Sequence, residues 1–530
     1  MDVAYAELHC LTNFTFLRGA SHPEELIKRA LALGYSGLAI TDECSFAGSA
    51  RAHLALRELR EIDAAAREFR LIHGTELRLA AAGGARGPRL VLLAQNRAGY
   101  GNLAQLVTLG RRKAVKGSYR LSRGDLEQHA GWLDDTLALL LADEGEPDLL
   151  AHARWLQQLM PVRSWIACEL LHVGDDAAHL AHVADVAEQI GMPLMASGDV
   201  HMHVRQRKPL ADVLAAVREK TPLAVAGTRL LTNAEHYLRP LYRLARIYPA
   251  PLLLETLAIA ARCTFSLDEL RYEYPEEIVP AGETPTAYLR RLTYEGAARR
   301  YPKGVSEKVR AALESELALV AELGYEPYFL TVYDIVRFAR DQKILCQGRG
   351  SAANSAMCYC LHITEVDPTR ATLLFERFIS KDRNEPPDID VDFEHERREE
   401  VMQFIFKKYG RDRAALTAAL HTYRPRGALR DVSKAFGLSL DQADKLARTM
   451  AWWDGKRIMR ERLLEAGFDP DNPVIAQIAE LSQELVGFPR HLSQHSGGFI
   501  IARARCACHS TTPWCAPACR LGRATGQTPC

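Results

Sequence analysis

Three carboxylates alternate with apolar side chains in the stretch of this chain that carries the clearest chemical signal. Residues 387–393 read Pro-Asp-Ile-Asp-Val-Asp-Phe, the period of a β-strand with one acidic face and one apolar face. Carboxylates two residues apart on a strand lie about 6.7 Å apart and, when ionised, repel by roughly 2.5 kcal/mol at an effective dielectric near 20. Asp388, Asp390 and Asp392 therefore call for a compensating cation, and paired divalent ions are the usual solution where phosphoryl groups are transferred.

Two plainer interpretations of this acidic stretch are a solvated strand face and a calcium loop. A loop of the EF-hand type is disfavoured because the intervening residues are large and apolar, and because the glycine of its tight turn is missing. The solvated face stays open on these residues alone.

A glycine turn precedes the acidic strand. An apolar run ends at Cys346, Gly348-Arg349-Gly350-Ser351 follows, and an alanine-rich helical segment leaves the turn. Ser351 is a candidate helix cap, the helix start offers amides to a phosphate, and Arg349 can add a forked contact. The turn lacks the Lys-Ser/Thr pair of a Walker loop, and a plain strand-to-helix connection is the alternative. Together with the acidic strand it predicts a triphosphate site with metal beside it.

Basic residues follow in local excess, although the whole chain is balanced at 67 basic and 66 acidic residues. From 401 to 430 there are seven Lys or Arg residues against one acid. This pattern fits a surface that follows a nucleic-acid backbone, and a solvated helix face is the alternative. The candidate DNA-binding residues are Lys407, Lys408, Arg424, Arg426 and Arg430.

These motifs resemble the bacterial C-family DNA polymerases, the group that contains the alpha subunit of DNA polymerase III. Gly348–Ser351 resembles the nucleotide loop of the family's palm domain, and Pro387–Phe393 resembles its catalytic strand. Arg490–Phe499 resembles the segment that returns from thumb to palm. The opening, Glu7–Ala20, is similar to the error-prone branch rather than the replicative one. The resemblance runs from about residue 4 to about residue 503.

The resemblance implies an enzyme that joins a primer 3′ hydroxyl to a deoxynucleoside triphosphate in translesion synthesis and damage-induced mutagenesis. Asp390 and Asp392 would bind two Mg²⁺ ions, and Gly348, Arg349, Gly350 and Ser351 would bind the nucleotide. The implied partners are primer–template DNA, deoxynucleoside triphosphates and other DNA repair or replication proteins.

The resemblance also implies that the first domain is a polymerase-and-histidinol-phosphatase (PHP) domain, a distorted barrel that can bind metal. Apolar strands that end in polar residues, such as those before Asp42 and Glu76, fit the site-bearing end of such a barrel. The family's His-x-His opening is broken, however, because Leu11 follows His9, and Glu43 stands where the family has another His. The remaining candidate ligands are His9, Glu76, Asp199 and His201. These losses predict a structural remnant without hydrolytic chemistry.

The expected fold class is therefore α/β and multidomain, with a PHP-type distorted (β/α) barrel, a palm of the nucleotidyltransferase type and a helical thumb. The expected boundaries are 1–265 for the PHP domain, 266–284 for a linker, 285–420 for the palm, 421–492 for the thumb, 493–503 for a return to the palm and 504–530 for a disordered tail.

The tail departs from the rest of the chain. Five of the twelve cysteines fall in the last 25 residues, and no acidic residue follows Ala502. A zinc module is one interpretation, but the spacing of its ligands fits no common finger. Out-of-frame translation after about residue 502 is the favoured one. The chain would then lack the fingers and the family's third palm aspartate, and we expect no primer extension from it. The zinc module would use Cys506, Cys508, His509, Cys515 and Cys519.

Two other functions remain as alternatives: a fragment of a replicative DNA polymerase III alpha subunit, and a PHP-type metal-dependent phosphoesterase. The absence of a signal peptide and of a membrane-length apolar run predicts a cytoplasmic protein without a membrane partner.

Overall fold

The computed structural model describes residues 4–81, 86–143, 146, 148–270, 273–275, 278–350, 354–367, 369–370, 389–448 and 460–503. The described residues form two compact units, one built from the chain up to residue 270 together with 416–498, the other from 273–415 together with 499–503. Ser351, Asp388 and the tail at 504–530, on which predictions fell, lie outside the described residues.

The first unit is built on a sheet of seven strands that lie in chain order. Neighbouring strands are parallel except that β4 runs antiparallel to both of its neighbours. A bridge between Cys10 and Val200 joins the chain beyond the first and last strands, so that the sheet is nearly closed into a barrel. The prediction of a distorted α/β barrel is confirmed. The strands are β1 (Ala6–Glu7), β2 (Gly37–Ile40), β3 (Arg70–Ala80), β4 (Arg86–Ala94), β5 (Thr136–Leu141), β6 (Ser164–Glu169) and β7 (Leu194–Ser197).

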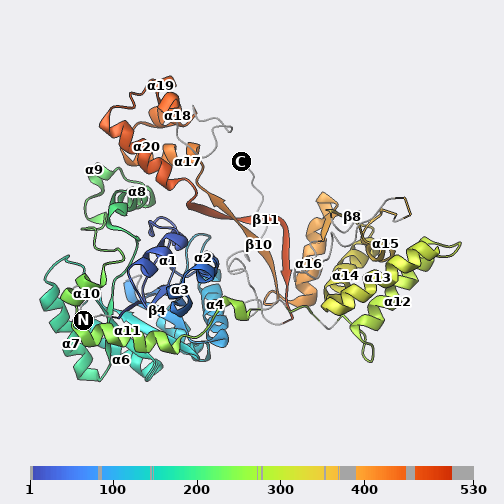
Figure 1. The fold of residues 1–530 in the computed structure, drawn as a ribbon, viewed down its shortest axis with the longest axis horizontal. Helices are drawn as coiled ribbons and strands as arrows, with labels where there is room; N and C mark the ends of the chain where they lie inside the picture. The colour runs from blue at the N-terminus through green and yellow to red at the C-terminus, as the bar shows by residue number, and fades with distance from the viewer. Residues whose placement is uncertain are drawn as a thin grey trace. The chain divides into compact units, whose positions relative to one another are not determined.

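Helices surround this sheet (Figure 1). Ala6, Ile72, Val91, Leu139 and Met195 share one buried apolar cluster from five different strands, as alternation along each strand requires. A second, larger cluster joins the other strand faces to the helices. The helices are α1 (Pro23–Ala32), α2 (Ser49–Ile62), α3 (Ala64–Glu68), α4 (Arg97–Arg112), α5 (Arg123–Gln128), α6 (Leu149–Leu159), α7 (Asp176–Ile190), α10 (Leu241–Ile247) and α11 (Ala250–Arg262).

One segment of the described chain, Ala250–Glu269, is long and apolar enough to cross a membrane by length and composition alone. Its helical part, α11, packs against β1 and β7. Leu253, Ile259 and Ala260 are buried there in the two clusters of the barrel. The segment therefore behaves as the core helix of a folded domain.

The same unit contains a group of helices from the second half of the chain, which pack on α8. Figure 1 shows α17 and α20 beside α8. Leu214 of α8, Val432 of α17 and Ile478 of α20 belong to one buried cluster, and Arg207 pairs with Glu484 at 3.3 Å. The elements are α8 (Lys208–Glu219), α9 (Leu223–Ala226), α17 (Pro425–Ala435), α18 (Leu440–Arg448), α19 (Arg460–Glu465) and α20 (Pro473–Leu485), with β10 (Ala414–Thr422) paired to β11 (Pro489–Ile501).

The second unit is mainly helical with a two-stranded sheet of β8 and β9. Its core gathers Leu313, Phe329 and Met357 from three helices, and Ile389 and Val391 pack against it. The elements are α12 (Pro285–Arg300), α13 (Glu307–Leu323), α14 (Glu326–Asp341), β8 (Cys346–Arg349), α15 (Ala356–Cys360), β9 (Asp390–Phe393) and α16 (Arg398–Tyr409).

Candidate active site

The glycine turn and the acidic strand are brought together by the antiparallel pairing of β8 with β9. Arg349 lies opposite Asp390, and Gln347 lies opposite Asp392. Gly350 follows with a φ of +65°, a backbone conformation that favours glycine. A Cβ atom on Gly350 would lie 3.7 Å from Oδ2 of Asp390. The turn and the first of the two aspartates are therefore immediate neighbours.

Gly348 is fixed in this arrangement by close packing. Its amide donates to the carbonyl oxygen of Ile363 at 2.6 Å. A Cβ atom at this position would lie 2.4 Å from the same oxygen, which is too close for any real side chain. β8 can approach the backbone at Ile363 this closely only because residue 348 is glycine.

The acidic and apolar faces of β9 are separated as the alternating sequence predicts. Ile389 and Val391 pack on the core of the second unit, whereas Asp390 and Asp392 are exposed. Arg349 Nε donates to Oδ2 of Asp392 at 2.9 Å. The acidic strand is thus confirmed, and Arg349 of the neighbouring strand β8 supplies a cation to Asp392, while the catalytic role of the two aspartates stays a prediction.

The helix after the turn differs from the prediction. α15 begins at Ala356 and is capped by Ser355, whose side chain accepts from the amide of Cys358. The first two amides of α15, those of Ala356 and Met357, donate to the carboxylate of Glu316 at 2.9 Å each. The first amides of α15 are therefore not available to a phosphate, because a buried side chain already binds them. The helix start predicted at Ser351 lies outside the described residues.

Glu316 is a buried acid that the sequence analysis did not identify. It lies on α13, 3% exposed, and it also accepts from the Ser355 hydroxyl at 2.8 Å. Burial raises the pKa of Glu316 to about 7, against the opposing effect of the three hydrogen bonds. A carboxyl group in such a position fixes the first turn of α15 beside the glycine turn.

The predicted DNA-binding residues fall into two groups. Lys407 and Lys408 lie on α16 in the second unit, and the three arginines lie at the start of α17 or on it in the first unit. Lys408 is paired with the buried Asp334, and Arg430 is paired with Asp444 at 2.7 Å. Lys408 and Arg430 thus serve ion pairs within the fold.

The other members are better placed to meet a ligand. Lys407, Arg424 and Arg426 are exposed. Arg424 occupies the N-cap position of α17 without a capping side-chain hydrogen bond, and Arg426 lies in the first turn of that helix.

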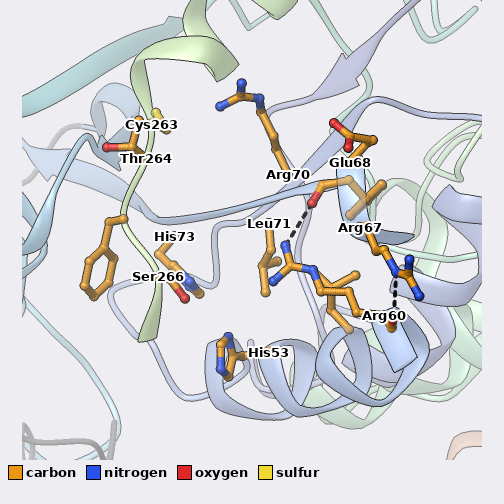
Figure 2. A pocket seen from close by; sticks show the side chains of 13 residues that line it. His53, Arg60, Arg67, Glu68, Arg70, Leu71, His73, Cys263, Thr264 and Ser266 are labelled. Atoms are coloured by element: carbon orange, nitrogen blue, oxygen red, sulfur yellow. Dashed lines mark hydrogen bonds between the residues drawn. The ribbon is translucent and has the colours of Figure 1, made fainter. Parts of the chain in front are cut away.

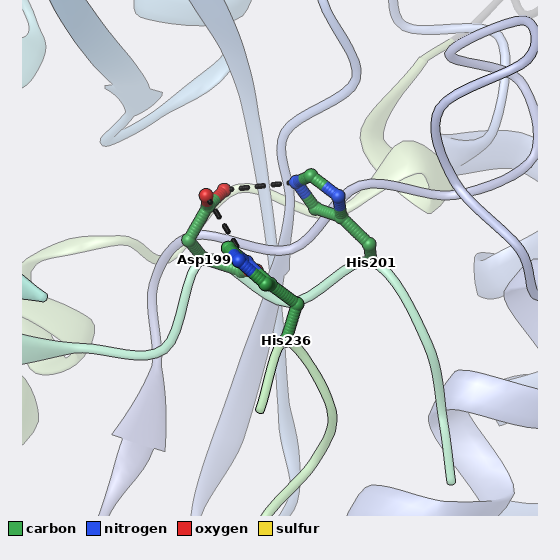
Figure 3. Close-up of side chains that lie close together, drawn as sticks. All are labelled: Asp199, His201 and His236. Carbon is green, nitrogen blue, oxygen red and sulfur yellow. Dashed lines mark hydrogen bonds and ion pairs between the residues drawn. The ribbon is translucent and has the colours of Figure 1, made fainter. Parts of the chain in front are cut away.

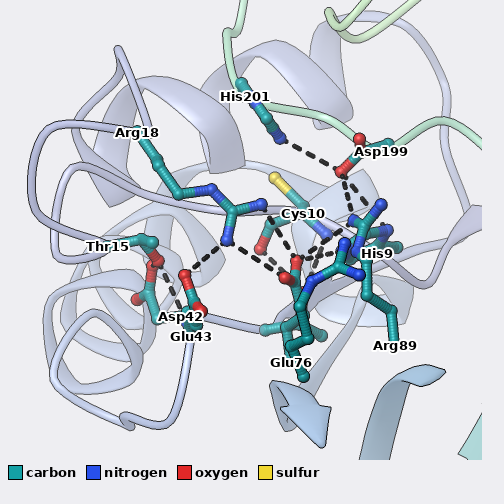
Figure 4. Close-up of polar contacts among 12 residues, drawn as sticks. His9, Cys10, Thr15, Arg18, Asp42, Glu43, Glu76, Arg89, Asp199 and His201 are labelled. Atoms are coloured by element: carbon teal, nitrogen blue, oxygen red, sulfur yellow. Dashed lines mark hydrogen bonds and ion pairs between the residues drawn. The ribbon is translucent and has the colours of Figure 1, made fainter. Parts of the chain in front are cut away.

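A second polar centre lies at one end of the barrel, where strand ends carry acids and histidines (Figure 4). His9 Nε2 lies 2.9 Å from Oε2 of Glu76, and His9 Nδ1 lies 2.8 Å from Oε1 of Glu169. Asp199 Oδ1 lies 3.5 Å from His9 Nδ1 and 3.1 Å from His201 Nε2. The four predicted ligands, His9, Glu76, Asp199 and His201, therefore do come together.

Two arginines that were not predicted from the sequence also enter this centre: Arg89, which is buried, and Arg18, whose side chain is 20% exposed. Arg18 donates to Glu76 at 3.0 and 3.3 Å and to Glu43 at 2.5 Å. Arg89 on β4 lies 3.4 Å from Glu76 and 3.5 Å from Asp199. Glu169 is a further missed member.

The carboxylates and cations of this centre shift one another's pKa values. Burial acts to lower the pKa of His9, but the carboxylates of Asp199, Glu169 and Glu76 outweigh it and raise that pKa to about 10. Burial acts to raise the pKa of Glu76, and Arg18 and Arg89 outweigh it and hold that pKa well below its usual range. The centre is therefore a network of opposite charges.

Two groups of three residues in the described chain bring their ligand atoms close enough to hold a metal ion: His9 with Glu76 and Asp199, and Asp199 with His201 and His236. Figure 3 shows the second group, in which the Asp199 carboxylate contacts both histidines. The rings of His201 and His236 stack with their centroids 4.9 Å apart. His236 Nδ1 also contacts the backbone carbonyl of Asp199 at 2.9 Å.

An open pocket of about 290 Å³ lies against α2, α3 and the start of β3. Figure 2 shows Arg60, Arg67 and Arg70 around it. The Arg60 guanidinium donates to the backbone carbonyls of Ala66 and Phe69, so that it holds the chain around the pocket. None of the predicted site residues lines it.

Comparison with known proteins finds two families along the chain. Residues 7–169 match the family described as "PHP domain", and residues 287–518 match "Bacterial DNA polymerase III alpha NTPase domain". The chain is 57% identical over 518 residues to an error-prone DNA polymerase of Azoarcus sp., and 56% identical over 501 residues to one of Methylococcus capsulatus. Each comparison covers 94% of this chain.

The chain belongs to the C-family DNA polymerases, in their error-prone branch. It spans about half the length of these relatives, 48% of the Azoarcus protein and 46% of the Methylococcus one. Among solved structures, an amidohydrolase from Chromobacterium violaceum is 16% identical with a TM-score of 0.25, covering 37% of this chain and 87% of that one; this likeness is too low to bear on the fold. Within the family, the named relatives favour the error-prone branch over the replicative alternative.

Proposed function

We propose that this chain carries the palm, thumb and PHP parts of an error-prone DNA-directed DNA polymerase. The reaction joins the 3′ hydroxyl of a DNA primer to a deoxynucleoside triphosphate and releases pyrophosphate. The observation that carries the proposal is the pairing of β8 with β9, which sets the glycine turn beside Asp390 and Asp392 in a chain related to error-prone DNA polymerases.

The donor set of this site fits magnesium. Carboxylate oxygens are the ligands that Mg²⁺ prefers, and in nucleotide sites it is commonly held by one or two carboxylates together with substrate phosphates and water. Asp390 and Asp392 are exposed on one face of β9, and they would hold the ions. Bound Mg²⁺ would neutralise charge on the triphosphate and on the attacking oxygen.

The chain's own residues would position the nucleotide. Gly348 and Gly350 let the backbone approach the phosphates closely, because neither carries a side chain. Arg349 pairs with Asp392, and its planar guanidinium can donate two hydrogen bonds to a phosphate in a forked geometry. Glu316 fixes α15 next to this turn through its three hydrogen bonds.

Residues 285–420 would then act as the palm and 421–492 as the thumb. Arg424 and Arg426 at the start of α17 would contact the phosphates of primer–template DNA, since sequence-independent binding rests on such cations. Lys407 would add a contact from α16. Other repair or replication proteins are the expected partners, and the cytoplasm is the expected location.

Binding of a Mn²⁺–dATP complex, followed by electron paramagnetic resonance, tests the site directly. Asp390→Asn and Asp392→Asn should each weaken binding at least about tenfold, because each removes one carboxylate ligand of the metal. Asp341→Asn, at an exposed carboxylate on α14 of the same unit, is the matched control. Equal binding by the two site variants and the control would contradict the proposal.

Primer extension with Mg²⁺ is a separate test. We expect no product from the 530-residue polypeptide, because only two of the three palm aspartates of the family are identified in it. Failure of the unmodified chain to bind Mn²⁺–dATP would refute the site, whereas clear extension would refute only this expectation.

A further inference from the structure

The barrel centre raises a question that is independent of the polymerase proposal: whether metal belongs there, as in other PHP domains. Both carboxylate oxygens of Glu76 are already in contact with guanidinium groups. Oε1 accepts from Arg18 at 3.0 Å, and Oε2 is contacted by Arg18 at 3.3 Å and by Arg89 at 3.4 Å. Asp199 Oδ1 is contacted by Arg89 at 3.5 Å. Each of the two central acids therefore has an internal cation.

The histidine part of the site does not fit a metal either. His9 uses Nε2 for Glu76 and Nδ1 for Glu169, so neither ring nitrogen is left for an ion. Leu11, in the position of the second histidine of the opening motif, is fully buried and has no ligand atom. The residues present do not fit the ion that the family implies, as long as the arginines remain.

We infer that the guanidinium groups of Arg18 and Arg89 take the place of divalent metal at the centre of this barrel, an arrangement called here the arginine lock. Arg18 thereby also fixes the loop 11–22, against which the α17–α20 helices pack. The barrel is then a metal-independent support for these helices.

The loop 11–22 is held at several points on the barrel. The Thr15 hydroxyl donates to Asp42 at 2.7 Å, and the amide of Ala20 donates to the carbonyl of His201 at 2.7 Å. Leu17, directly before Arg18, has a φ of 61°, a conformation that is unfavourable for a leucine and persists only where the surroundings impose it. The next residue, Arg18, is held by its ion pairs with Glu76 and Glu43.

The same loop meets the second group of helices. Ala20 is buried in the apolar cluster that includes α8, α17 and α20, and Leu17 packs against that cluster. His22 meets Phe488, which follows α20, edge to face with ring centroids 4.6 Å apart. A displacement of the loop would therefore remove part of the surface on which α17 and α20 pack.

Arg18→Gln tests this lock, because it removes the charge and keeps much of the side-chain volume. The Arg18 side chain is 20% exposed, but its partner Glu76 is buried, and leaving a buried carboxylate with one cation fewer is strongly destabilising. We therefore expect the midpoint of thermal unfolding to fall by at least about 5 °C. Arg51→Gln is the matched control, since Arg51 pairs with Glu24 in a partly exposed contact of the same unit and should shift the midpoint by about 1 °C or less. Arg18→Lys should be intermediate, because it keeps the charge but not the fork.

Hydrogen exchange shows whether the loop supports the helices. In Arg18→Gln, the amides of α17 and α20 should exchange roughly tenfold faster than in the unmodified chain, with no such change in Arg51→Gln. A midpoint for Arg18→Gln equal to that of the Arg51→Gln control, or unchanged exchange in α17 and α20, would overturn the inference.

Metal content of the unmodified chain gives a test that needs no variant. After purification and dialysis, we expect well under one zinc or manganese ion per chain by mass spectrometry. We also expect the unfolding midpoint to be unchanged by EDTA or by added Zn²⁺. The opposite result would be stoichiometric metal that EDTA removes, with a fall in the unfolding midpoint, and that is absent from His236→Ala or Asp199→Asn. It would show that the group of Asp199, His201 and His236 holds an ion, and it would refute the arginine lock.

Discussion

The buried carboxyl group of Glu316 makes the stability of the second unit depend on pH in a predictable direction. Its pKa is raised from 4.5 to about 7 in the folded chain, so the folded chain binds a proton more tightly than the unfolded chain does. The stabilisation from this proton is complete below pH 4.5 and is lost as the pH rises through about 7. At about 1.4 kcal/mol for each pH unit between these values, the loss is about 3 kcal/mol.

Glu316→Gln removes this dependence, because an amide does not titrate. Its NH₂ group must face the amide of Ala356, the amide of Met357 or the hydroxyl of Ser355, all of which donate to the carboxylate. One donor is then left without an acceptor, at a cost of about 1–3 kcal/mol at acid pH. The variant should therefore be clearly less stable than the unmodified chain at pH 5 and close to it at pH 8.

Hydrogen exchange of the α15 amides, corrected for the intrinsic effect of pH, measures this difference locally. The free energy of opening of the unmodified chain minus that of Glu316→Gln should fall by about 3 kcal/mol between pH 5 and pH 8. Glu314→Gln is the control, because Glu314 lies on the same helix but pairs with Arg290 at the surface. The same pH dependence in the Glu316→Gln variant as in the unmodified chain would refute the reasoning.

Two further outcomes follow from the glycine turn and from the arginines of α17. Gly348→Ala should weaken Mn²⁺–dATP binding at least about tenfold and lower the unfolding midpoint, because the added Cβ would lie 2.4 Å from the carbonyl oxygen of Ile363. Gly131→Ala is the control and should change neither quantity, because nothing lies within 4 Å of the added Cβ. Equal behaviour of the two variants would contradict the packing argument. The double variant Arg424→Gln/Arg426→Gln should lower the slope of log K against log salt for primer–template binding by about 2, as expected for two lost phosphate contacts; an unchanged slope would remove these arginines from the DNA surface.

Local periodicity predicted most of the elements. The sequence pattern of residues 307–323 predicts a helix with the bounds of α13, and the alternating acids predict β9. The pattern from Glu394 to Tyr409 also predicts one helix, but α16 begins only at Arg398, after a 3₁₀ turn at His395–Arg397. Such patterns succeed because burial of one face imposes a period of 2 or 3.6 on the nearby sequence.

Polar partners far apart in the chain could not be predicted in this way. Arg18 and Arg89 contact Glu76 from positions 58 and 13 residues away, and nothing in their local sequence marks them as partners of a buried acid. Lys408 and Arg430 were predicted to bind DNA. Their acidic partners, Asp334 and Asp444, lie in other elements, so that the local sequence does not show these ion pairs.

Two missed residues did leave a signal. Glu169 ends the apolar strand β6, the same pattern that identified the other acids of the barrel end. Glu316 lies three residues after Leu313 and four before Val320, both buried. It therefore falls on the apolar stripe of α13, where an acid needs hydrogen-bond partners.

The most direct test of the central claim is the position of metal and nucleotide in a crystal of this chain grown with Mn²⁺ and dATP. We expect anomalous density for Mn²⁺ at about 2.2 Å from carboxylate oxygens of Asp390 and Asp392, with the triphosphate on the turn at Gly348–Gly350. Manganese held elsewhere, with these two carboxylates bound only to water or to Arg349, would contradict it.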